Sequence, residues 1–578
     1  MNRFRELDAR WRWGVLVLFG ALLIAAVNVW WIIEKRHGYP FNVDEYGYTA
    51  IGLADWLGFK SGGLHGWWEA IQQQAPNAPL MTTLTSVVLI LSPGLMQGFA
   101  VLIAFAVVQV MLSFALATRL AGPRLGALAA LAVATSEGLL LFAREYVFAL
   151  PAATSTTLAV YCIVRSDGMR KRWWSAAVGA SVGLMLLSRT MAVAFVPGVA
   201  VAALIVLLAR GKGSYVTRFV NYGIAIVVGF LVAATWYWHN LTPVYNYLTE
   251  FGYGEQAQYY GAEHSAVSWA RFKTVAEIVV RSDLLAPLAF LTLVGLVVLG
   301  VVAVRRLATS DDRKGTIFHI AGSNVLVVIV VFCAGFAALM SSQNAGDGFT
   351  FPLSMLLPPI AVVALRYVPK ASIPVAVLVA LIGIANLLTT ANLSESLSKQ
   401  RLVEFPPLGE VPWVNGEPHA VAAIRYQVPG PAYEFTKAEL GWQVLDEELA
   451  DVFTEPIGPE HSVPALVAFA SRNRVISTNS VGAIGLLDHH VSIPFTQLSA
   501  TPSDTVANYV DELRNPEHGQ PPVLVTMSSE VNDFPPELTQ SKVVEAAKRV
   551  GFHKLHEYTA PDGRRVYVWV RTKPLSPG

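Results

Sequence analysis

The sequence predicts a polytopic α-helical membrane protein with a soluble α/β domain at its C-terminal end. Three observations predict this: 54% of the 578 residues are hydrophobic, only 14% are charged, and the apolar residues gather in long runs before residue 390. A soluble globular protein carries about 25% charged residues. The net charge of +1 gives no indication of a nucleic-acid partner, and we expect none. We expect two domains, residues 1–390 in the membrane and residues 391–578 outside it.

About eleven apolar runs qualify as membrane spans. Crossing the hydrocarbon core takes about 20 apolar residues, and shorter runs suffice where protein shields their ends. The first run is too long for a signal peptide and is followed by no small-residue cleavage site, so we expect it to remain as an anchor. The predicted spans are 13–34, 95–118, 124–142, 150–165, 175–188, 191–209, 219–238, 284–304, 316–340, 353–367 and 372–390. The shorter run at 80–92 predicts a helix lying at the membrane surface.

The basic residues of the short loops predict the orientation of these spans. Lysine and arginine gather in every second loop, for example in segments 165–172 and 305–314. Cytoplasmic loops carry this excess. The N-terminus is therefore expected in the cytoplasm and everything after about residue 391 outside. We expect a multi-pass protein of the bacterial inner (plasma) membrane with an extracytoplasmic C-terminal domain.

The segment after residue 391 alternates between patterns typical of strands and of helices. Asp504 is the expected N-cap of one helix, and Gly551 is expected to end another. The predicted elements are strands at 463–470 and 522–527, helices at 504–514 and 543–550, and a final strand at 564–571. The two cysteines, Cys162 and Cys333, lie inside apolar runs, which predicts small core residues and no disulfide.

The adjacent acids Asp44 and Glu45 are the strongest candidates for a functional site. They lie just after the first span, on the predicted outer side. A carboxylate beside lipid keeps its charge only where water, a cation or a hydrogen-bond donor is near. The alternative is that both are solvated acids that end a hydrophobic helix. Carboxylates also suit Mg²⁺, Mn²⁺ or Ca²⁺, so the sequence leaves open a divalent cation held by Asp44 and Glu45.

Cationic side chains occur in two other outer segments. Arg144 and Glu145 lie between spans three and four, and Arg189 lies between spans five and six. A guanidinium group matches the oxygens of a lipid phosphate. The alternatives are an interfacial ion pair for Arg144 and Glu145, and a snorkelling turn residue for Arg189.

Aromatic and histidine residues are candidates for contacts with a substrate. They are Tyr46 beside the acid pair and, in the outer segment 239–283, His239, Tyr259, Tyr260 and His264. The alternatives are an ordinary interfacial histidine at 239 and an exposed one at 264. The sequence contains no P-loop, so nucleotide-driven transport is not expected.

Taken together, these motifs resemble the GT-C glycosyltransferase superfamily, most nearly its branch of protein O-mannosyltransferases and aminoarabinose lipid A transferases. The resemblance covers about residues 10–390. It consists of Asp44-Glu45-Tyr46, the turn Ala78-Pro79-Leu80, Arg144-Glu145 followed by Leu150-Pro151, and Ser188-Arg189-Thr190. The arginine that the family often has before its late proline-rich span has no counterpart in segment 347–359.

The resemblance implies transfer of a sugar from a polyprenyl-phosphate donor to a cell-envelope polysaccharide, glycolipid or protein. Asp44 would be the general base of an inverting reaction, and Glu45 would position the acceptor. Arg144 and Arg189 would contact the donor phosphate, while Glu145 would orient Arg144 or touch the sugar. Two rival hypotheses are a transporter or flippase for lipid or solute, and a non-catalytic envelope-assembly protein whose C-terminal domain is the binding module.

Overall fold

The structure is a computed structural model of the chain. It describes residues 2–36, 40–210, 214–254, 257, 267–344, 346, 348–391, 401–414, 440–456, 463–471, 473, 476–500, 502–529, 538–561 and 563–571. The chain folds into two compact units. The first unit is Met1–Lys35, Ile71–Thr83 and Phe99–Pro418, and the second is Arg36–Ala70, Leu84–Gly98 and His419–Gly578.

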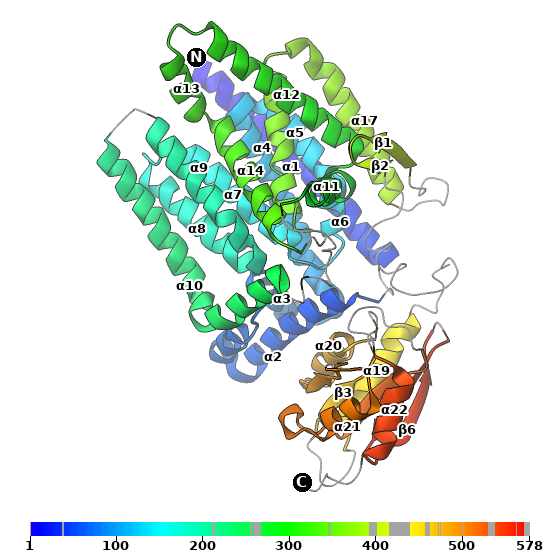
Figure 1. Cartoon of the computed structure of the whole chain (residues 1–578). Coiled ribbons are helices and arrows are strands. Elements are labelled where there is room, and N and C mark those ends of the chain that lie inside the picture. Colours follow the sequence, from blue (N-terminus) through cyan, green and yellow to red (C-terminus); the bar gives the residue numbers. More distant parts are fainter. Residues whose placement is uncertain are drawn as a thin grey trace. The chain divides into compact units, whose positions relative to one another are not determined.

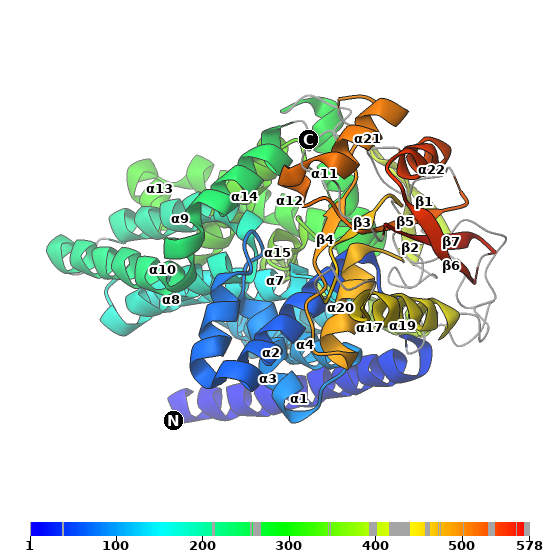
Figure 2. The ribbon, with the colours of Figure 1, turned by 90° about the horizontal axis from the view of Figure 1, so that it is seen from below.

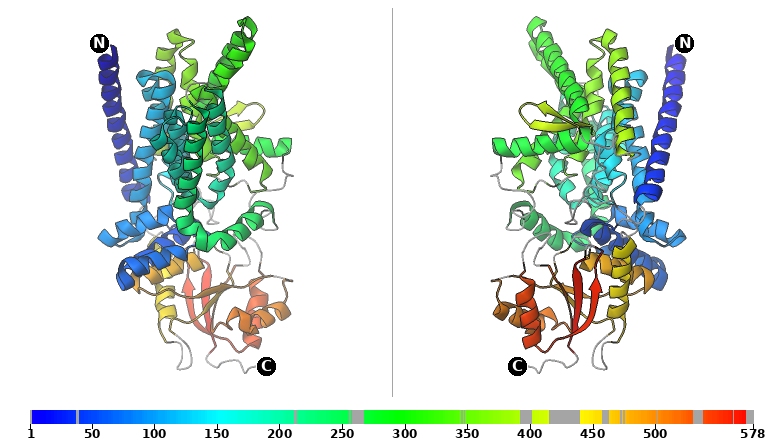
Figure 3. Two further views of the ribbon diagram at one scale, coloured as in Figure 1. Left: turned by 90° about the vertical axis from the view of Figure 1, so that its left-hand side faces the viewer. Right: turned by 90° about the vertical axis from the view of Figure 1, so that its right-hand side faces the viewer.

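The first unit is mainly helical (Figure 1). Its helices are α1 (Asn2–Trp31), α4 (Gly98–Ala121), α5 (Pro123–Ala134), α6 (Glu137–Phe142), α7 (Ala149–Ser166), α8 (Arg172–Ser188), η3 (Thr190–Phe195), α9 (Val196–Ala209), α10 (Tyr215–Tyr253), α11 (Trp269–Ile278), η5 (Val279–Leu284), α12 (Ala286–Thr309), α13 (Arg313–Ala321), α14 (Asn324–Ser341), α15 (Phe351–Ser354), α16 (Leu357–Ala364), η6 (Pro369–Ala371) and α17 (Ser372–Thr390). A hairpin of β1 (Arg401–Phe405) and β2 (Gly409–Val414) follows, and η1 (Ile32–Arg36) continues α1. Figure 3 shows α1 along one edge of this unit.

Seven helical segments of the described residues are long and apolar enough to cross a membrane. They are Ala9–Arg36, Leu95–Ala121, Thr190–Ala209, Tyr215–Tyr253, Ala286–Thr309, Asn324–Ser341 and Pro369–Thr390. Each corresponds to one of the predicted spans, and the chain is a multi-pass membrane protein. The other four predicted spans form shorter or less apolar helices, which include α7 and α8. Helix α7 is buried along almost its whole length, so it needs little of the apolar surface that a lipid-facing helix presents.

Four predicted spans differ in detail from the structure, and one of them, 124–142, is divided between α5 and α6. The run 316–340 is two helices, because α13 ends at Gly322 and Ser323 caps α14 by accepting a hydrogen bond from the Leu326 amide. The run 353–367 is likewise divided between α15 and α16. The span predicted to end at residue 238 continues as α10 as far as Tyr253.

Small residues allow the helices of the first unit to approach closely. Helix α8 packs against both α7 and α10, as Figure 1 shows. A Cβ atom added at Gly179 would lie 2.0 Å from the carbonyl oxygen of Ala225, so only glycine fits at this crossing. Close backbone contact of this kind is typical of helix pairs in membranes.

The second unit combines two segments near the N-terminus with the C-terminal residues. Its N-terminal helices are α2 (Val43–Gln72), α3 (Leu80–Leu91), and η2 (Leu95–Gln97), of which α2 and α3 also extend into the first unit. Its C-terminal elements are α19 (Leu440–Thr454), β3 (Val467–Phe469), α20 (Thr478–Asp488), β4 (Phe495–Gln497), α21 (Val506–Arg514), η8 (Pro516–His518), β5 (Val523–Met527), α22 (Gln540–Arg549), β6 (His553–Thr559) and β7 (Arg565–Val570). Helix α2 bends at Gly63, whose φ of 60° is outside the helical range.

The C-terminal residues form a five-stranded mixed sheet in the order β4-β3-β5-β7-β6. Strand β3 is parallel to β4 and β5, whereas β7 is antiparallel to β5 and β6. Helices α19 and α20 cover one face of the sheet, and α21 and α22 cover the other (Figure 2). Alternate residues of β5 therefore enter two cores: Val523 and Val525 face α19 and α20, while Leu524 faces α21 and α22.

The strands and helices predicted after residue 391 are present, with one correction to a helix cap. Thr505, not Asp504, caps α21 through a bond from the Asn508 amide. The Asp504 carboxylate instead accepts bonds from Tyr509, Thr539 and Lys542. In the first unit, Cys162 is buried as predicted but Cys333 is exposed on α14, and both thiols are free.

Candidate active site

The acid pair lies at the first turn of α2, in the second unit. Asn42 caps this helix: its side-chain oxygen accepts bonds from the amides of Asp44 and Glu45, both at 2.9 Å. The Glu45 carboxylate accepts a bond from the Asn42 amide at 3.1 Å in return. This reciprocal arrangement is a capping box. Asp44 is exposed, whereas Glu45 is 1% exposed.

Glu45 is held from the preceding segment by a buried ion pair. Nη2 of Arg36 donates to Oε2 of Glu45 at 2.6 Å, and neither side chain is more than 1% exposed. Arg36 also donates to the Pro40 carbonyl and lies over the Phe41 ring. Glu45 is therefore occupied in fixing the start of α2, and Asp44 is the member of the pair that is open to solvent.

Tyr46, a predicted substrate contact, is buried directly behind the acid pair. Its side chain is 1% exposed, and its ring packs on Phe41 at a centroid distance of 5.3 Å. Burial raises the pKa of the Tyr46 hydroxyl, and the nearby Asp446 raises it further. The hydroxyl thus stays protonated at neutral pH, and the ring helps to fix the orientation of the helix start.

Arg144 lies in the first unit, in the turn that follows α6. Its Nε donates to the side-chain oxygen of Asn28 at 2.6 Å, and its Nη1 donates to the Thr390 carbonyl at 2.9 Å. The guanidinium also lies over the Trp31 ring, 4.7 Å from its centroid. Arg144 is 1% exposed. It therefore joins the ends of α1 and α17, and the adjacent Glu145 is half-buried.

Arg189 lies in the same unit, where α8 gives way to η3. Its Nη1 donates to the Gly348 carbonyl at 2.7 Å, and its guanidinium lies 4.0 Å from the centroid of the Phe349 ring. The neighbouring Thr190 donates to the Pro76 carbonyl at 2.6 Å. The Ser188-Arg189-Thr190 motif thus lies between the turn before α3 and the loop before α15.

The same loop approaches the Arg144 turn. A Cβ atom at Gly348 would lie 3.0 Å from Ala149 Cβ and 3.2 Å from the Phe142 ring, and Phe142 also packs on Phe351. Three of the four motifs predicted from the sequence are therefore gathered in the first unit. The fourth, the acid pair, belongs to the second unit.

The remaining predicted substrate contacts are only partly described. His239 is exposed within α10, in the continuation of that helix beyond the predicted span. Tyr259, Tyr260 and His264 lie outside the described residues. No substrate contact is assigned to them by the structure, and they stay predictions.

The buried polar residues of the first unit that had not been predicted include Arg271 and Asp283. Arg271 in α11 is 1% exposed and donates to the backbone carbonyls of Leu339 and Asn344, just before the loop that Arg189 holds. Asp283 is fully buried and accepts bonds from the hydroxyls of Thr350 and Ser354, both at 2.6 Å. Their positions inside the predicted outer segment 239–283 were the available signal.

The sequence also left open a divalent cation held by Asp44 and Glu45. Among the described residues, no group of three histidine, cysteine or acidic side chains converges. Glu45 is already paired with Arg36. The cation stays a prediction, and the reaction proposed below does not depend on one.

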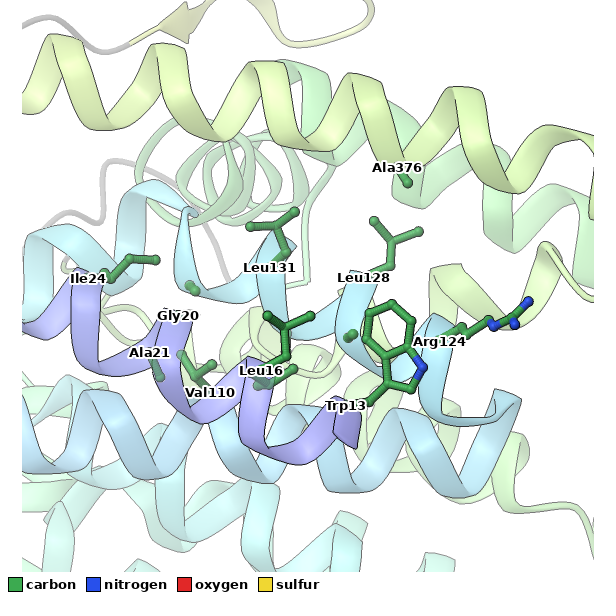
Figure 4. Close-up of a pocket in the computed structure, with 14 residues that line it drawn as sticks. Trp13, Leu16, Gly20, Ala21, Ile24, Val110, Arg124, Leu128, Leu131 and Ala376 are labelled. Carbon is green, nitrogen blue, oxygen red and sulfur yellow. The ribbon is translucent and has the colours of Figure 1, made fainter. Parts of the chain in front are cut away.

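An apolar groove of about 370 Å³ is separate from all of these residues. It lies among α1, α4, α5 and α17, and Figure 4 shows Trp13 and Arg124 at one end with apolar side chains along the rest. By the predicted orientation, Arg124 marks the cytoplasmic end.

No protein-family model matches the chain, and no curated protein matches it. Solved structures do. The crystal structure of ArnT from Cupriavidus metallidurans bound to undecaprenyl phosphate superimposes with a TM-score of 0.53 at 15% identity, covering 96% of this chain and 98% of that one. The chain has the ArnT fold. The apo form of ArnT gives a TM-score of 0.52 at 16% identity and covers 96% of this chain and 97% of ArnT.

ArnT is a GT-C glycosyltransferase, so the fold expected from the sequence motifs is confirmed. The ArnT fold extends over both units of this chain, including the C-terminal residues that lay outside the resemblance in sequence. A lower-scoring match is the oligosaccharyltransferase of Archaeoglobus fulgidus tethered with an acceptor peptide, with a TM-score of 0.46 at 12% identity over 96% of this chain and 74% of that one.

Proposed function

We propose that this protein is a glycosyltransferase that moves a sugar from a polyprenyl-phosphate donor to a cell-envelope acceptor on the extracytoplasmic face of the membrane. The observation that carries the proposal is an exposed carboxylate, Asp44, at a rigidly capped helix start in a chain with the ArnT fold. The ArnT structure was solved with undecaprenyl phosphate, a carrier of the proposed class. The acceptor is a polysaccharide, glycolipid or protein that presents a hydroxyl group.

The proposed reaction is an inverting displacement at the anomeric carbon. The acceptor oxygen forms a bond to that carbon as the bond to the donor phosphate breaks, and Asp44 takes the proton of the acceptor hydroxyl. General base help of this kind contributes about 10²–10⁴ in rate. The bonding electrons leave with the polyprenyl phosphate, which gains one negative charge.

Arg189 and Arg144 are proposed to stabilise the leaving phosphate. Arg189 is the more accessible of the two, since it is half-buried while Arg144 is 1% exposed. We assign direct contact with the phosphate to Arg189. Arg144 joins α1 and α17, and its positive charge contributes a favourable electrostatic field at the phosphate. Glu145 is proposed to lie near the sugar, beside Arg144.

The test uses membranes that contain the purified full chain. It measures the transfer of radiolabelled sugar from a panel of polyprenyl-phosphate hexoses and pentoses. We expect Asp44→Asn to lower transfer at least 100-fold, while Glu69→Gln, which changes another exposed acid of α2, leaves it unchanged. Full activity of Asp44→Asn would remove the base. Movement of the labelled donor across vesicles without transfer would favour a flippase instead.

A further inference from the structure

The C-terminal domain contacts the helix that carries Asp44. In the first turn of α20, Nδ2 of Asn479 donates to the Val43 carbonyl at 2.8 Å. The contact depends on Gly47, because a Cβ atom there would lie 2.9 Å from Nδ2 of Asn479. Asp44 follows Val43 directly and lies one helical turn before Gly47. The backbone on both sides of this acid is therefore in contact with one side chain of α20.

A second contact supports the first. Ser480, next to Asn479, donates to Oδ1 of Asp446 at 2.8 Å, and Asp446 is fully buried. The side chains of Ser477 and Ser480 cap α20 reciprocally, which fixes the turn that carries Asn479. Asp446 is also close enough to Tyr46 to affect it electrostatically.

A third contact lies farther along α2. The ring of His490, just beyond the end of α20, meets Trp56 edge-on at a centroid distance of 5.4 Å. Its Nε2 lies 2.9 Å from Nζ of Lys60. The C-terminal domain therefore holds α2 at its first turn and again near residues 56–60, which fixes the direction of the helix as well as its start.

We infer that the C-terminal domain positions the proposed base, and that Asn479 is the residue through which it does so. The inference rests on the proposed function. The backbone at Val43 and Gly47 sets where the Asp44 side chain starts, and a general base must lie within hydrogen-bond distance of the proton that it removes. A displacement of about 1 Å can cost 10²-fold in rate. Asn479 is a positioning residue and contacts no reacting atom.

Three variants and one control test this in the full-length protein. Asn479→Ala removes the bond to Val43, and Gly47→Ala displaces Asn479 while adding a better helix former to α2. The double variant removes the same contact from both sides. The control, Asn508→Ala, removes an equivalent side-chain bond to the Ser499 carbonyl at 3.2 Å, in α21.

The measurement is single-turnover transfer from saturating radiolabelled polyprenyl-phosphate sugar. We expect both single variants to lower the rate constant about tenfold with unchanged amplitude, the double variant to be no slower than the slower single variant, and the control to match wild type. An unchanged rate constant, or a loss of amplitude alone, would overturn the inference, because a purely structural role reduces the amount of active protein and not its rate.

Hydrogen exchange separates this inference from the proposed function. We expect the amides of residues 44–48 to exchange about tenfold faster in Asn479→Ala than in wild type, and not in Asn508→Ala. Equal exchange in all three would overturn the role of Asn479. If wild type transfers no sugar, the proposed function fails, and the exchange result still decides whether Asn479 holds the start of α2.

Discussion

The buried ion pair between Arg36 and Glu45 allows a direct test of whether Glu45 has a structural role, in contrast to the catalytic role proposed for Asp44. The change is Glu45→Gln, which keeps an acceptor for the Asn42 amide but removes the carboxylate that pairs with the buried Arg36 guanidinium. The pair is 2.6 Å long, and its members are 0% and 1% exposed. Removing one partner of such a pair costs about 3–5 kcal/mol. Because glutamine still accepts a bond from Arg36, we expect the lower value, about 3 kcal/mol.

This cost should appear as local opening of the start of α2. A free energy of about 3 kcal/mol corresponds to roughly 10²-fold faster exchange of the amides of residues 42–46 in Glu45→Gln. The double variant Arg36→Met, Glu45→Gln removes both charges of the pair, and its exchange should return to within about tenfold of wild type. The reasoning is refuted if Glu45→Gln exchanges like wild type, or if the double variant is as open as the single one.

Sugar transfer by the same variants decides the role of Glu45. If Glu45 only fixes the helix, transfer should fall in Glu45→Gln and recover with amide protection in the double variant. We expect this result because the carboxylate is 1% exposed. A double variant with normal protection and no transfer would instead support the predicted contact of Glu45 with the acceptor.

Three other predictions concern stability and can be checked by thermal and chemical unfolding of the full chain. Burial raises the pKa of Asp504, but the hydrogen bonds that its carboxylate accepts, first of all the one from Lys542, lower this pKa overall. Asp504→Asn should therefore lower the free energy of unfolding by about 1–2 kcal/mol at pH 7. The difference in stability between variant and wild type should shrink as the pH falls below about 4. Burial raises the pKa of Asp446, so wild type should lose stability relative to Asp446→Asn as the pH rises above about 4, by at most about 1.4 kcal/mol per pH unit. Gly348 has φ of 78° and close neighbours, so Gly348→Ala should cost about 1–3 kcal/mol and lower transfer, whereas Gly300→Ala, with open space around it, should not.

The sequence predicted the membrane-spanning character because hydropathy is a local property. Within the described part of the chain, seven of its runs are helices long and apolar enough to cross a membrane. The prediction of a single span at 316–340 was wrong, because Gly322 and Ser323 divide this run into two helices. The apolar residues around them outweigh these two residues in the hydropathy of the run. The prediction also ended α10 too early, because the helix continues as a polar and aromatic stretch beyond residue 238.

The candidate site was predictable only in part for a related reason. Asp44 and Glu45 are adjacent, so their prominence was visible in the chain, but their different roles depend on distant partners. Asn479 is 436 residues from Val43, and Arg144 is 116 and 246 residues from the partners that bury it. Periodicity and spacing carry no information about such pairs.

The arrangement explains why a domain without a recognisable catalytic motif accompanies this membrane protein. The base role proposed for Asp44 requires a carboxylate that an acceptor can reach, and Asp44 is exposed. A rigid backbone beneath an exposed side chain limits the positions that the side chain can take. Here the backbone is held from three directions: by the capping box of Asn42, by the buried pair of Glu45 with Arg36, and by Asn479. Only the last comes from the C-terminal domain, and it is the one that the first 390 residues cannot supply.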